Sequence, residues 1–158
     1  MASNKTHRNK GFSLLELVVV VVIIGIIAAV AIPRMSRGSA GAADAALSGN
    51  LAVLRNAIDM YAAEHTGTFP TVADAADQLT KYTDSAGDTA DKRDSTHLYG
   101  PYIRKIPPLP VGAAKGSTGI ADKAGDGVGW IYDSSTGDIT SNTTAKEEDA
   151  AGKLYTAY

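Results

Sequence analysis

The hydrophobic residues of this chain are concentrated near its N-terminus. Of the 21 residues from Phe12 to Ile32, 15 are Phe, Leu, Ile or Val, and Leu17 to Ile32 contains no polar side chain. A helix of this length can cross a hydrocarbon layer of roughly 30 Å. The ten residues before Gly11 carry three cations and no acid, a pattern that favours a cytoplasmic N-terminus. We therefore expect a membrane helix over residues 12–33.

Beyond this segment the apolar pattern becomes one-sided. Large apolar residues recur at steps of 4, 3, 4 and 3, at Leu47, Leu51, Leu54, Ile58 and Tyr61. This spacing is typical of one face of an amphipathic helix, so residues 34–66 are expected to continue the first helix to about His65. Gly67 and Pro70 are placed to end it.

Two residues inside the predicted long helix disfavour helical structure. Gly25 costs about 1 kcal/mol relative to alanine, and Pro33 removes a backbone hydrogen bond. We expect a bend or local unwinding between them. The alternative is that Pro33 simply ends the membrane helix.

Residues 67–158 predict a small, mixed C-terminal head. We expect a short helix from about Val72 to Tyr82 that buries Val72, Ala76 and Leu79, followed by an exposed loop over residues 83–97. Six prolines in the whole chain include four between residues 101 and 110, so residues 99–112 should be an extended connector. The expected fold class is α+β.

A β-hairpin should follow the connector. Residues 128–132 and 138–141 are strand-like, and the polar turn between them contains Gly137. Trp130 or Tyr132 should face the long helix as part of the core. The polar tail from residue 143 is either frayed or held by its large side chains, which are Leu154, Tyr155 and Tyr158.

One acidic residue, Glu16, stands inside the apolar segment. An ionised carboxylate in the bilayer costs roughly 2.5–3.5 kcal/mol, so its presence requires a functional explanation. A secretory signal peptide, with small residues at Ala29 and Ala31 before its cleavage site, would have no use for the acid. A plain single-pass anchor would have none either.

A third interpretation accounts for the acid. The run Gly11-Phe12-Ser13-Leu14-Leu15-Glu16, between a short basic leader and a long apolar segment, resembles the class III signal of type IV pilins and pseudopilins. The resemblance implies that prepilin peptidase removes residues 1–11 by cutting between Gly11 and Phe12, and that Phe12 becomes N-methylated. It also implies a lollipop-shaped subunit, with a long helix and a small head.

The family resemblance and the physical argument agree on Glu16. The freed amine of a neighbouring subunit can pair with this carboxylate, and a buried charge becomes tolerable when it is paired. Glu16 would then set the register of a helical homo-oligomeric filament. In the family, glycine and proline at the places of Gly25 and Pro33 accompany helix melting during assembly.

The connector resembles the major pseudopilin of type II secretion, with Gly100-Pro-Tyr, the basic pair Arg104-Lys105 and a proline-rich turn. Leu109 and Val111 depart from that family's usual acid and aromatic residue. The implied function is a type II secretion pseudopilus subunit in the bacterial inner membrane, with a periplasmic head. Its implied partners are prepilin peptidase, an inner-membrane assembly platform and minor pilins or pseudopilins. The alternatives are a type IV pilin of an extracellular surface pilus, or a membrane-tethered binding module.

Composition narrows the remaining chemistry. The chain has no cysteine and a formal net charge of -2, so it offers no disulfide, no thiolate and no basic footprint for nucleic acid. The three histidines are scattered along the chain and form no catalytic or metal-binding pattern, so we do not expect this protein to be an enzyme. Pseudopilins of the major type II class commonly hold calcium in a C-terminal loop, and the candidate ligands in this chain are Asp122, Asp126, Asp133 and Asp138. The alternative is that these are solvated turn residues.

Overall fold

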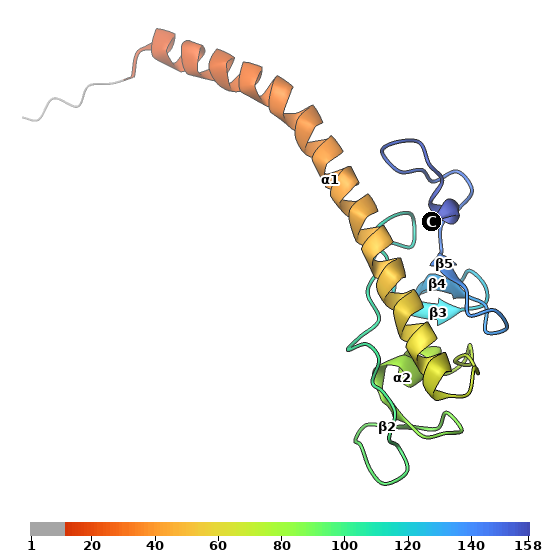
Figure 1. The fold of residues 1–158 in the computed structure, drawn as a ribbon. Helices are drawn as coiled ribbons and strands as arrows, with labels where there is room; N and C mark the ends of the chain where they lie inside the picture. Colours follow the sequence, from red (N-terminus) through yellow and green to blue (C-terminus); the bar gives the residue numbers. More distant parts are fainter. Residues whose placement is uncertain (1–11) are drawn as a thin grey trace, which may run out of the picture. The chain divides into compact units, whose positions relative to one another are not determined.

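We describe residues 12–158 of a computed structural model, and for residues 32–38 the backbone alone. The chain divides into two compact units, Met1–Gly38 and Ser39–Tyr158. Helix α1 (Leu14–Glu64) begins in the first unit and ends in the second. The second unit also contains α2 (Ala75–Thr80), β1 (Tyr82–Thr83), β2 (Thr89–Ala90), β3 (Gly119–Ala121), β4 (Val128–Tyr132), β5 (Ile139–Ser141) and the short 3-10 helix η1 (Tyr155–Ala157) (Figure 1). The expected α+β class is confirmed.

Helix α1 ends where the glycine signal indicated. The amide of Gly67 donates to the carbonyl of Ala62 at 2.8 Å, which closes the last turn. Thr66 and Gly67 both adopt positive φ, at 56° and 85°, as residues after a helix commonly do. Thr66 thus adopts a left-handed backbone conformation that is more usual for glycine.

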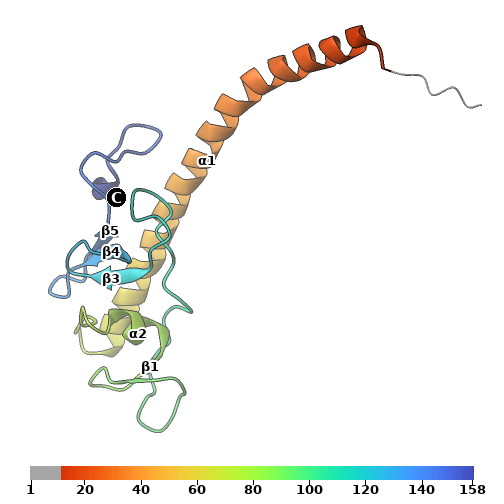
Figure 2. The ribbon, with the colours of Figure 1, turned by 180° about the vertical axis from the view of Figure 1, so that it is seen from behind.

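The C-terminal strands form one three-stranded sheet with β4 in the centre (Figure 2). The expected hairpin is confirmed, because β5 pairs antiparallel with β4 and Tyr132 lies opposite Ile139. The parallel strand β3 was not expected. It approaches closely at Gly119, where a Cβ would lie 2.6 Å from the carbonyl oxygen of Gly127.

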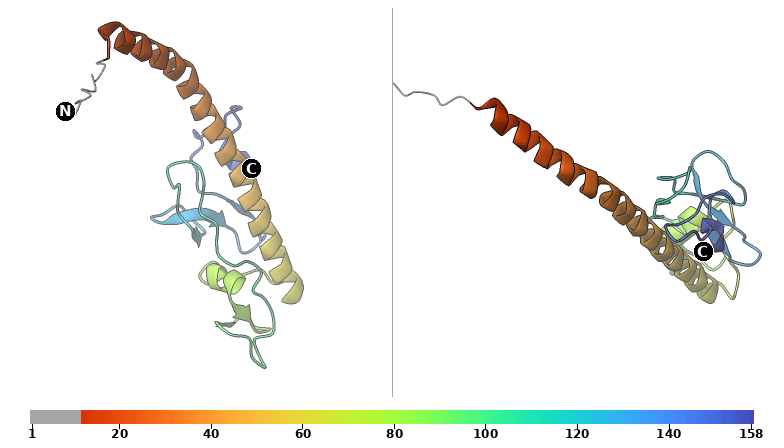
Figure 3. Two further views of the ribbon diagram at one scale, coloured as in Figure 1. Left: turned by 90° about the vertical axis from the view of Figure 1, so that its left-hand side faces the viewer. Right: turned by 90° about the horizontal axis from the view of Figure 1, so that it is seen from above.

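The core of the second unit lies between α1, α2, the connector and the sheet. Figure 3 shows the sheet and α2 beside the second-unit part of α1 in both views. Its buried hydrophobic residues include Leu47, Leu51, Leu54, Ile58 and Tyr61 of α1, Ala75 and Leu79 of α2, Leu109 and Val111 of the connector, and Trp130, Tyr132 and Ile139 of the sheet. The one-sided apolar pattern of residues 47–61 therefore predicted the correct helix face.

Both aromatic residues of β4 belong to this core, as expected. Trp130 and Tyr132 are almost completely buried. The indole of Trp130 donates to the carbonyl of Pro107 at 2.8 Å, and the hydroxyl of Tyr132 donates to that of Pro70 at 3.0 Å. These bonds join the sheet to the connector and to the loop after α1.

Helix α2 is shorter than the predicted helix from Val72 to Tyr82, and its buried face differs. Thr71 accepts a hydrogen bond from the amide of Asp74 at 3.3 Å, so a turn precedes the helix. Ala75 and Leu79, one turn apart, face the core, whereas Ala76 is exposed and Val72 is half-buried. The prediction that Ala76 is buried was therefore wrong.

The prediction that residues 83–97 form only an exposed loop was also wrong. Strands β1 and β2 pair antiparallel, and Thr83 is fully buried. Thr83 also exchanges two backbone hydrogen bonds of 3.1 Å with Tyr99. The carboxylate of Asp84 accepts the amides of Ala86 and Asp88 and thereby closes the turn. Polar residues form this hairpin because local side-chain to backbone bonds replace an apolar pattern.

The C-terminal tail is held against α1. The hydroxyl of Tyr155 donates to Asp44 at 2.7 Å, and the amide of Ala150 donates to the other oxygen of the same carboxylate at 3.0 Å. Tyr155 and Tyr158 also pack against the core. The tail from residue 143 was expected to be either frayed or held by its large side chains, and the structure shows that it is held.

Candidate assembly site at the start of α1

The side chains of Ser13 and Glu16 cap the start of helix α1. The amide of Ser13 donates to Glu16 Oε2 at 2.9 Å, and Ser13 Oγ accepts the amide of Leu15 at 3.3 Å. Helix N-termini leave amides without intrahelical partners, and this pair of side-chain contacts satisfies two of them. The Glu16 carboxylate is thus directed back toward the first residue of the helix.

The helix surface after these capping residues is apolar, and the other described residues of the first unit do not cover it. Between residues 12 and 158, Leu14–Ala31 is the one helical window apolar and long enough to cross a membrane, with a mean hydropathy of 3.1. At 1.5 Å per residue its 18 residues span about 27 Å. None of this window is buried, so it requires a lipid or protein environment to remove it from water.

Glu16 is the one ionisable residue between Phe12 and Ala31, and it lies beside a hollow in the apolar surface. The hollow has a volume of about 320 Å³ and is otherwise lined by Phe12, Leu15, Val19 and Val20. Phe12 is 83% exposed. This arrangement puts a single anionic group at the edge of an apolar depression at the start of the helix.

The other expected N-terminal residues have varied outcomes. Gly11 and the expected leader 1–11 lie outside the described residues. The local unwinding expected between Gly25 and Pro33 is not present, because α1 is helical throughout that interval. The alternative, in which Pro33 ends the helix, is wrong for the same reason. A Cβ at Gly25 would meet nothing within 4 Å, so packing within the chain does not require glycine there.

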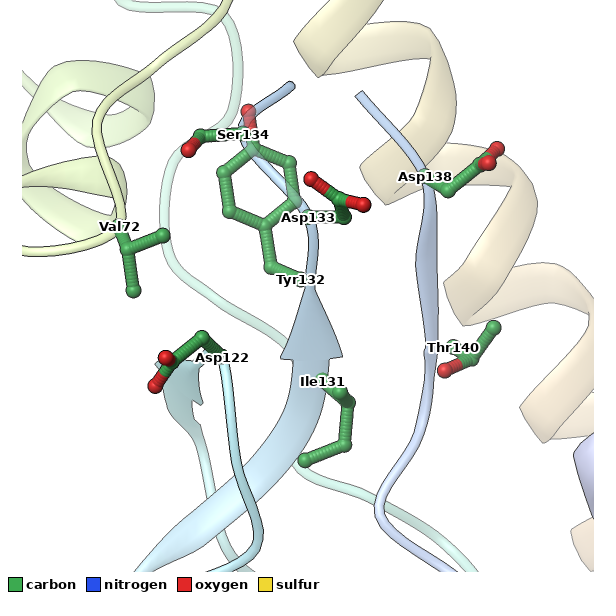
Figure 4. A pocket seen from close by; sticks show the side chains of 8 residues that line it. All are labelled: Val72, Asp122, Ile131, Tyr132, Asp133, Ser134, Asp138 and Thr140. Carbon is green, nitrogen blue, oxygen red and sulfur yellow. The ribbon is translucent and has the colours of Figure 1, made fainter. Parts of the chain in front are cut away.

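The structure does not gather the four candidate calcium ligands into one site. Asp122, Asp133 and Asp138 line a hollow of about 550 Å³ beside the sheet, whereas Asp126 does not line it. Figure 4 shows the three carboxylates spread around this hollow rather than converging. Over residues 12–158, no group of three or more His, Cys, Asp or Glu residues is placed to hold a metal ion.

Asp133 is instead engaged in its own turn. Its carboxylate accepts both the hydroxyl and the amide of Ser135, at 2.6 and 2.8 Å. These hydrogen bonds lower the pKa of Asp133 against the opposing effect of burial. The arrangement is that of a turn-forming aspartate, which corresponds to the alternative interpretation of these residues.

Two histidines of the second unit are used structurally. His65 is 4% exposed, and its Nδ1 and Nε2 lie 2.9 and 2.8 Å from the carbonyl oxygens of Tyr61 and Asp84. His97 pairs with the carboxylate of Asp94 at 2.9 Å. His65 thereby connects the end of α1 to the β1–β2 turn.

Ser13 is the functional candidate that sequence reasoning missed. Its signal was available, because Ser-x-x-Glu before an apolar run is the pattern of a capping box. The resemblance to a processing signal covers the same residues and accounts for Glu16 without assigning a role to Ser13. The structure adds a local role for Ser13 and a second role for Glu16.

Comparison with known proteins agrees with the N-terminal interpretation. No curated protein and no solved structure matches the chain. Residues 6–32 match the family model described as the prokaryotic N-terminal methylation motif. The chain therefore carries, over these residues, the N-terminal signal of type IV pilins and pseudopilins.

Proposed function

We propose that this protein is a structural subunit of a pilin-like filament, and that within this class it is a subunit of a type II secretion pseudopilus. Its role is mechanical rather than catalytic. The observation that carries the proposal is the uncovered apolar part of α1 with a single carboxylate at its start. A membrane can store such a helix, and packing against helices of other copies can replace the lipid during assembly.

The pairing of Glu16 with an amine explains why the acid is present. Cleavage between Gly11 and Phe12 by prepilin peptidase creates an ammonium group at Phe12, which is then methylated. In an apolar filament core, an unpaired carboxylate and an unpaired ammonium each cost several kcal/mol, and pairing offsets much of that cost. A subunit at the wrong axial height would leave both charges unpaired, so this contact selects the register.

The second-unit part of α1 supports the same proposal. Its side away from the core carries an exposed, uncharged stripe at steps of 3, 4, 3 and 4, formed by Ala46, Gly49, Val53, Asn56 and Met60. Val53 and Met60 are 50% and 47% exposed. A surface with this spacing is suited to packing against other helices, so we propose that it contacts other subunits.

The type II assignment rests on the connector. The run from Gly100 to Val111 keeps the basic pair Arg104-Lys105 and the prolines of the major pseudopilin, and it leads into the three-stranded sheet. On this proposal the second unit lies in the periplasm and the apolar helix in the inner membrane. The partners are an assembly platform and minor pseudopilins. Impaired secretion in a deletion strain, together with no fibres on the surface of wild-type cells, would favour type II secretion. Fibres on the surface of wild-type cells under native expression would favour a type IV pilus.

The experiment that tests the filament proposal combines N-terminal mass spectrometry with a fibre assay. We expect a mature chain that begins with N-methylated Phe12. Glu16→Ala should remain inserted and cleaved but yield few filaments, whereas Asp59→Ala, at an exposed position of the same helix, should assemble normally. An intact Met1, a chain starting at Ile32, or normal filament yield from Glu16→Ala would contradict the proposal.

A further inference from the structure

Glu16 can meet an incoming amine only if its side chain is held in a suitable orientation, and the structure shows what holds it. Glutamate has several rotatable bonds, and on a helix its carboxylate can extend sideways over the apolar surface. Here the amide of Ser13 donates to Glu16 Oε2 at 2.9 Å, which folds the side chain back toward the helix start. The orientation is therefore set by the capping arrangement.

This arrangement is compatible with both binding and processing. Within residues 12–158, the hydrogen bond to the carboxylate goes to Oε2 alone, so the cap uses one oxygen of Glu16 and leaves the other out of it. The amide that donates to Oε2 belongs to the Phe12–Ser13 peptide bond. Because the proposed cleavage falls one bond earlier, between Gly11 and Phe12, the contact survives processing.

The hollow beside Glu16 gives the orientation a purpose. The depression lined by Phe12, Leu15, Val19 and Val20 borders the same carboxylate. A neighbouring N-terminal aromatic residue could occupy an apolar depression of this kind while its amine reaches the free oxygen. In the observed orientation the carboxylate borders the hollow, so both contacts can form at the same place.

We propose that Ser13 is a positioning residue for filament assembly, acting through Glu16. This inference rests on the proposed filament function. The hydroxyl of Ser13 accepts the amide of Leu15 at 3.3 Å and so stabilises the first turn in which the Ser13 amide meets Glu16. Without this acceptor the first turn frays, and the carboxylate samples orientations that do not meet the partner amine. The role requires a hydrogen-bond acceptor at residue 13 rather than a hydroxyl donor.

The test measures filament yield in cells for Ser13→Ala, Ser13→Thr and Ser13→Asn, with N-terminal mass spectrometry to quantify cleavage and methylation. We expect Ser13→Ala to be cleaved as in the wild type but to give at least fivefold fewer filaments. Threonine and asparagine are both good helix caps, so both variants should restore most of the yield. Ser48→Ala, an exposed serine on the same helix, is the matched control and should assemble normally.

A double variant separates positioning through Glu16 from a general effect on the helix. If Ser13 acts through Glu16, Ser13→Ala combined with Glu16→Ala should assemble no worse than Glu16→Ala alone, because coupled residues are not additive. Additive losses would overturn the proposal. So would normal assembly of Ser13→Ala, failure of asparagine to rescue, or a loss fully explained by reduced cleavage.

The same experiment distinguishes the two levels of inference. Normal assembly of Ser13→Ala together with failed assembly of Glu16→Ala removes the role of Ser13 and leaves the filament proposal intact. Normal assembly of Glu16→Ala removes both.

Discussion

Two adjacent residues of α1, Leu54 and Val53, should respond in opposite ways to replacement by alanine. Leu54 is fully buried in the core of the second unit, whereas Val53 is 50% exposed on the uncharged stripe. Because the second unit contains its own core, residues 39–158 should fold as a soluble domain without the apolar helix. This fragment allows stability to be measured apart from assembly.

The expected magnitudes differ widely. Replacing a buried leucine by alanine typically costs about 3 kcal/mol or more, through lost transfer energy and the cavity that remains. For a unit of about 120 residues the unfolding entropy is about 0.25 kcal/mol/K, so the Tm of Leu54→Ala should fall by about 12 °C. Val53→Ala loses little burial and gains helix propensity, so its Tm should change by less than about 2 °C.

Differential scanning calorimetry of the two variants in the 39–158 fragment measures this difference. In the full-length chain the order of the two effects should be reversed. Val53→Ala should reduce filament yield more than Leu54→Ala does, although the fold of the Val53→Ala variant is intact. Equal Tm losses for the two variants, or a larger loss for Val53→Ala, would refute the assignment of the buried and exposed faces. Insolubility of the fragment itself would refute the independence of the second unit.

Two further predictions concern the second unit. Gly137→Ala should destabilise the fragment by more than the roughly 1–2 kcal/mol expected for the positive φ of 79° alone, because its Cβ would also lie 2.5 Å from the ring of Phe69. An unchanged Tm of the fragment would contradict this turn geometry. The amides of Thr144 and Ala113 donate to the carboxylate of Glu147 at 2.6 and 2.7 Å and lower its pKa. The resulting stabilisation should be present above the unfolded pKa of about 4.3 and be lost as the pH falls below that value. Glu147→Gln should therefore reduce the acid-induced drop in the urea midpoint between pH 6 and 3, and an unchanged drop would contradict the role of this carboxylate.

The properties of the apolar start of α1 could be predicted from the amino-acid sequence, because they depend on residues close together along the chain. A run of Leu, Val and Ile as long as Leu17–Ile32 is apolar on every side of a helix, whatever it packs against. The capping arrangement of Ser13 and Glu16 is equally local, since three residues separate them. The matching methylation motif over residues 6–32 lies in this part of the chain.

The sequence also predicted the core face of α1 and the β4–β5 hairpin. Both follow from regular periodicity, with steps of 3 and 4 in the helix and two strands joined by a short polar turn. The buried positions of Leu51 and Tyr132 therefore agree with the pattern.

The roles of the polar residues in the second unit depend on tertiary contacts that the sequence pattern does not indicate. Thr83 is buried although its neighbours are polar, because Tyr99 pairs with its backbone from sixteen residues away. Strand β3 pairs with β4 through a close backbone approach at Gly119, and its sequence has no alternation of apolar residues that would predict a strand. Such contacts depend on which distant segments the core brings together.

The aspartates show the same limit for a candidate site. Four acidic residues within residues 122–138 could have surrounded an ion, and three of them do line one hollow. The three carboxylates that line it lie apart just beyond the strand ends (Figure 4), and that of Asp133 accepts hydrogen bonds from the amide and hydroxyl of Ser135. Closeness along a chain limits how far apart residues can be, but convergence of their side chains depends on strand register and local hydrogen bonding, which only the folded arrangement supplies.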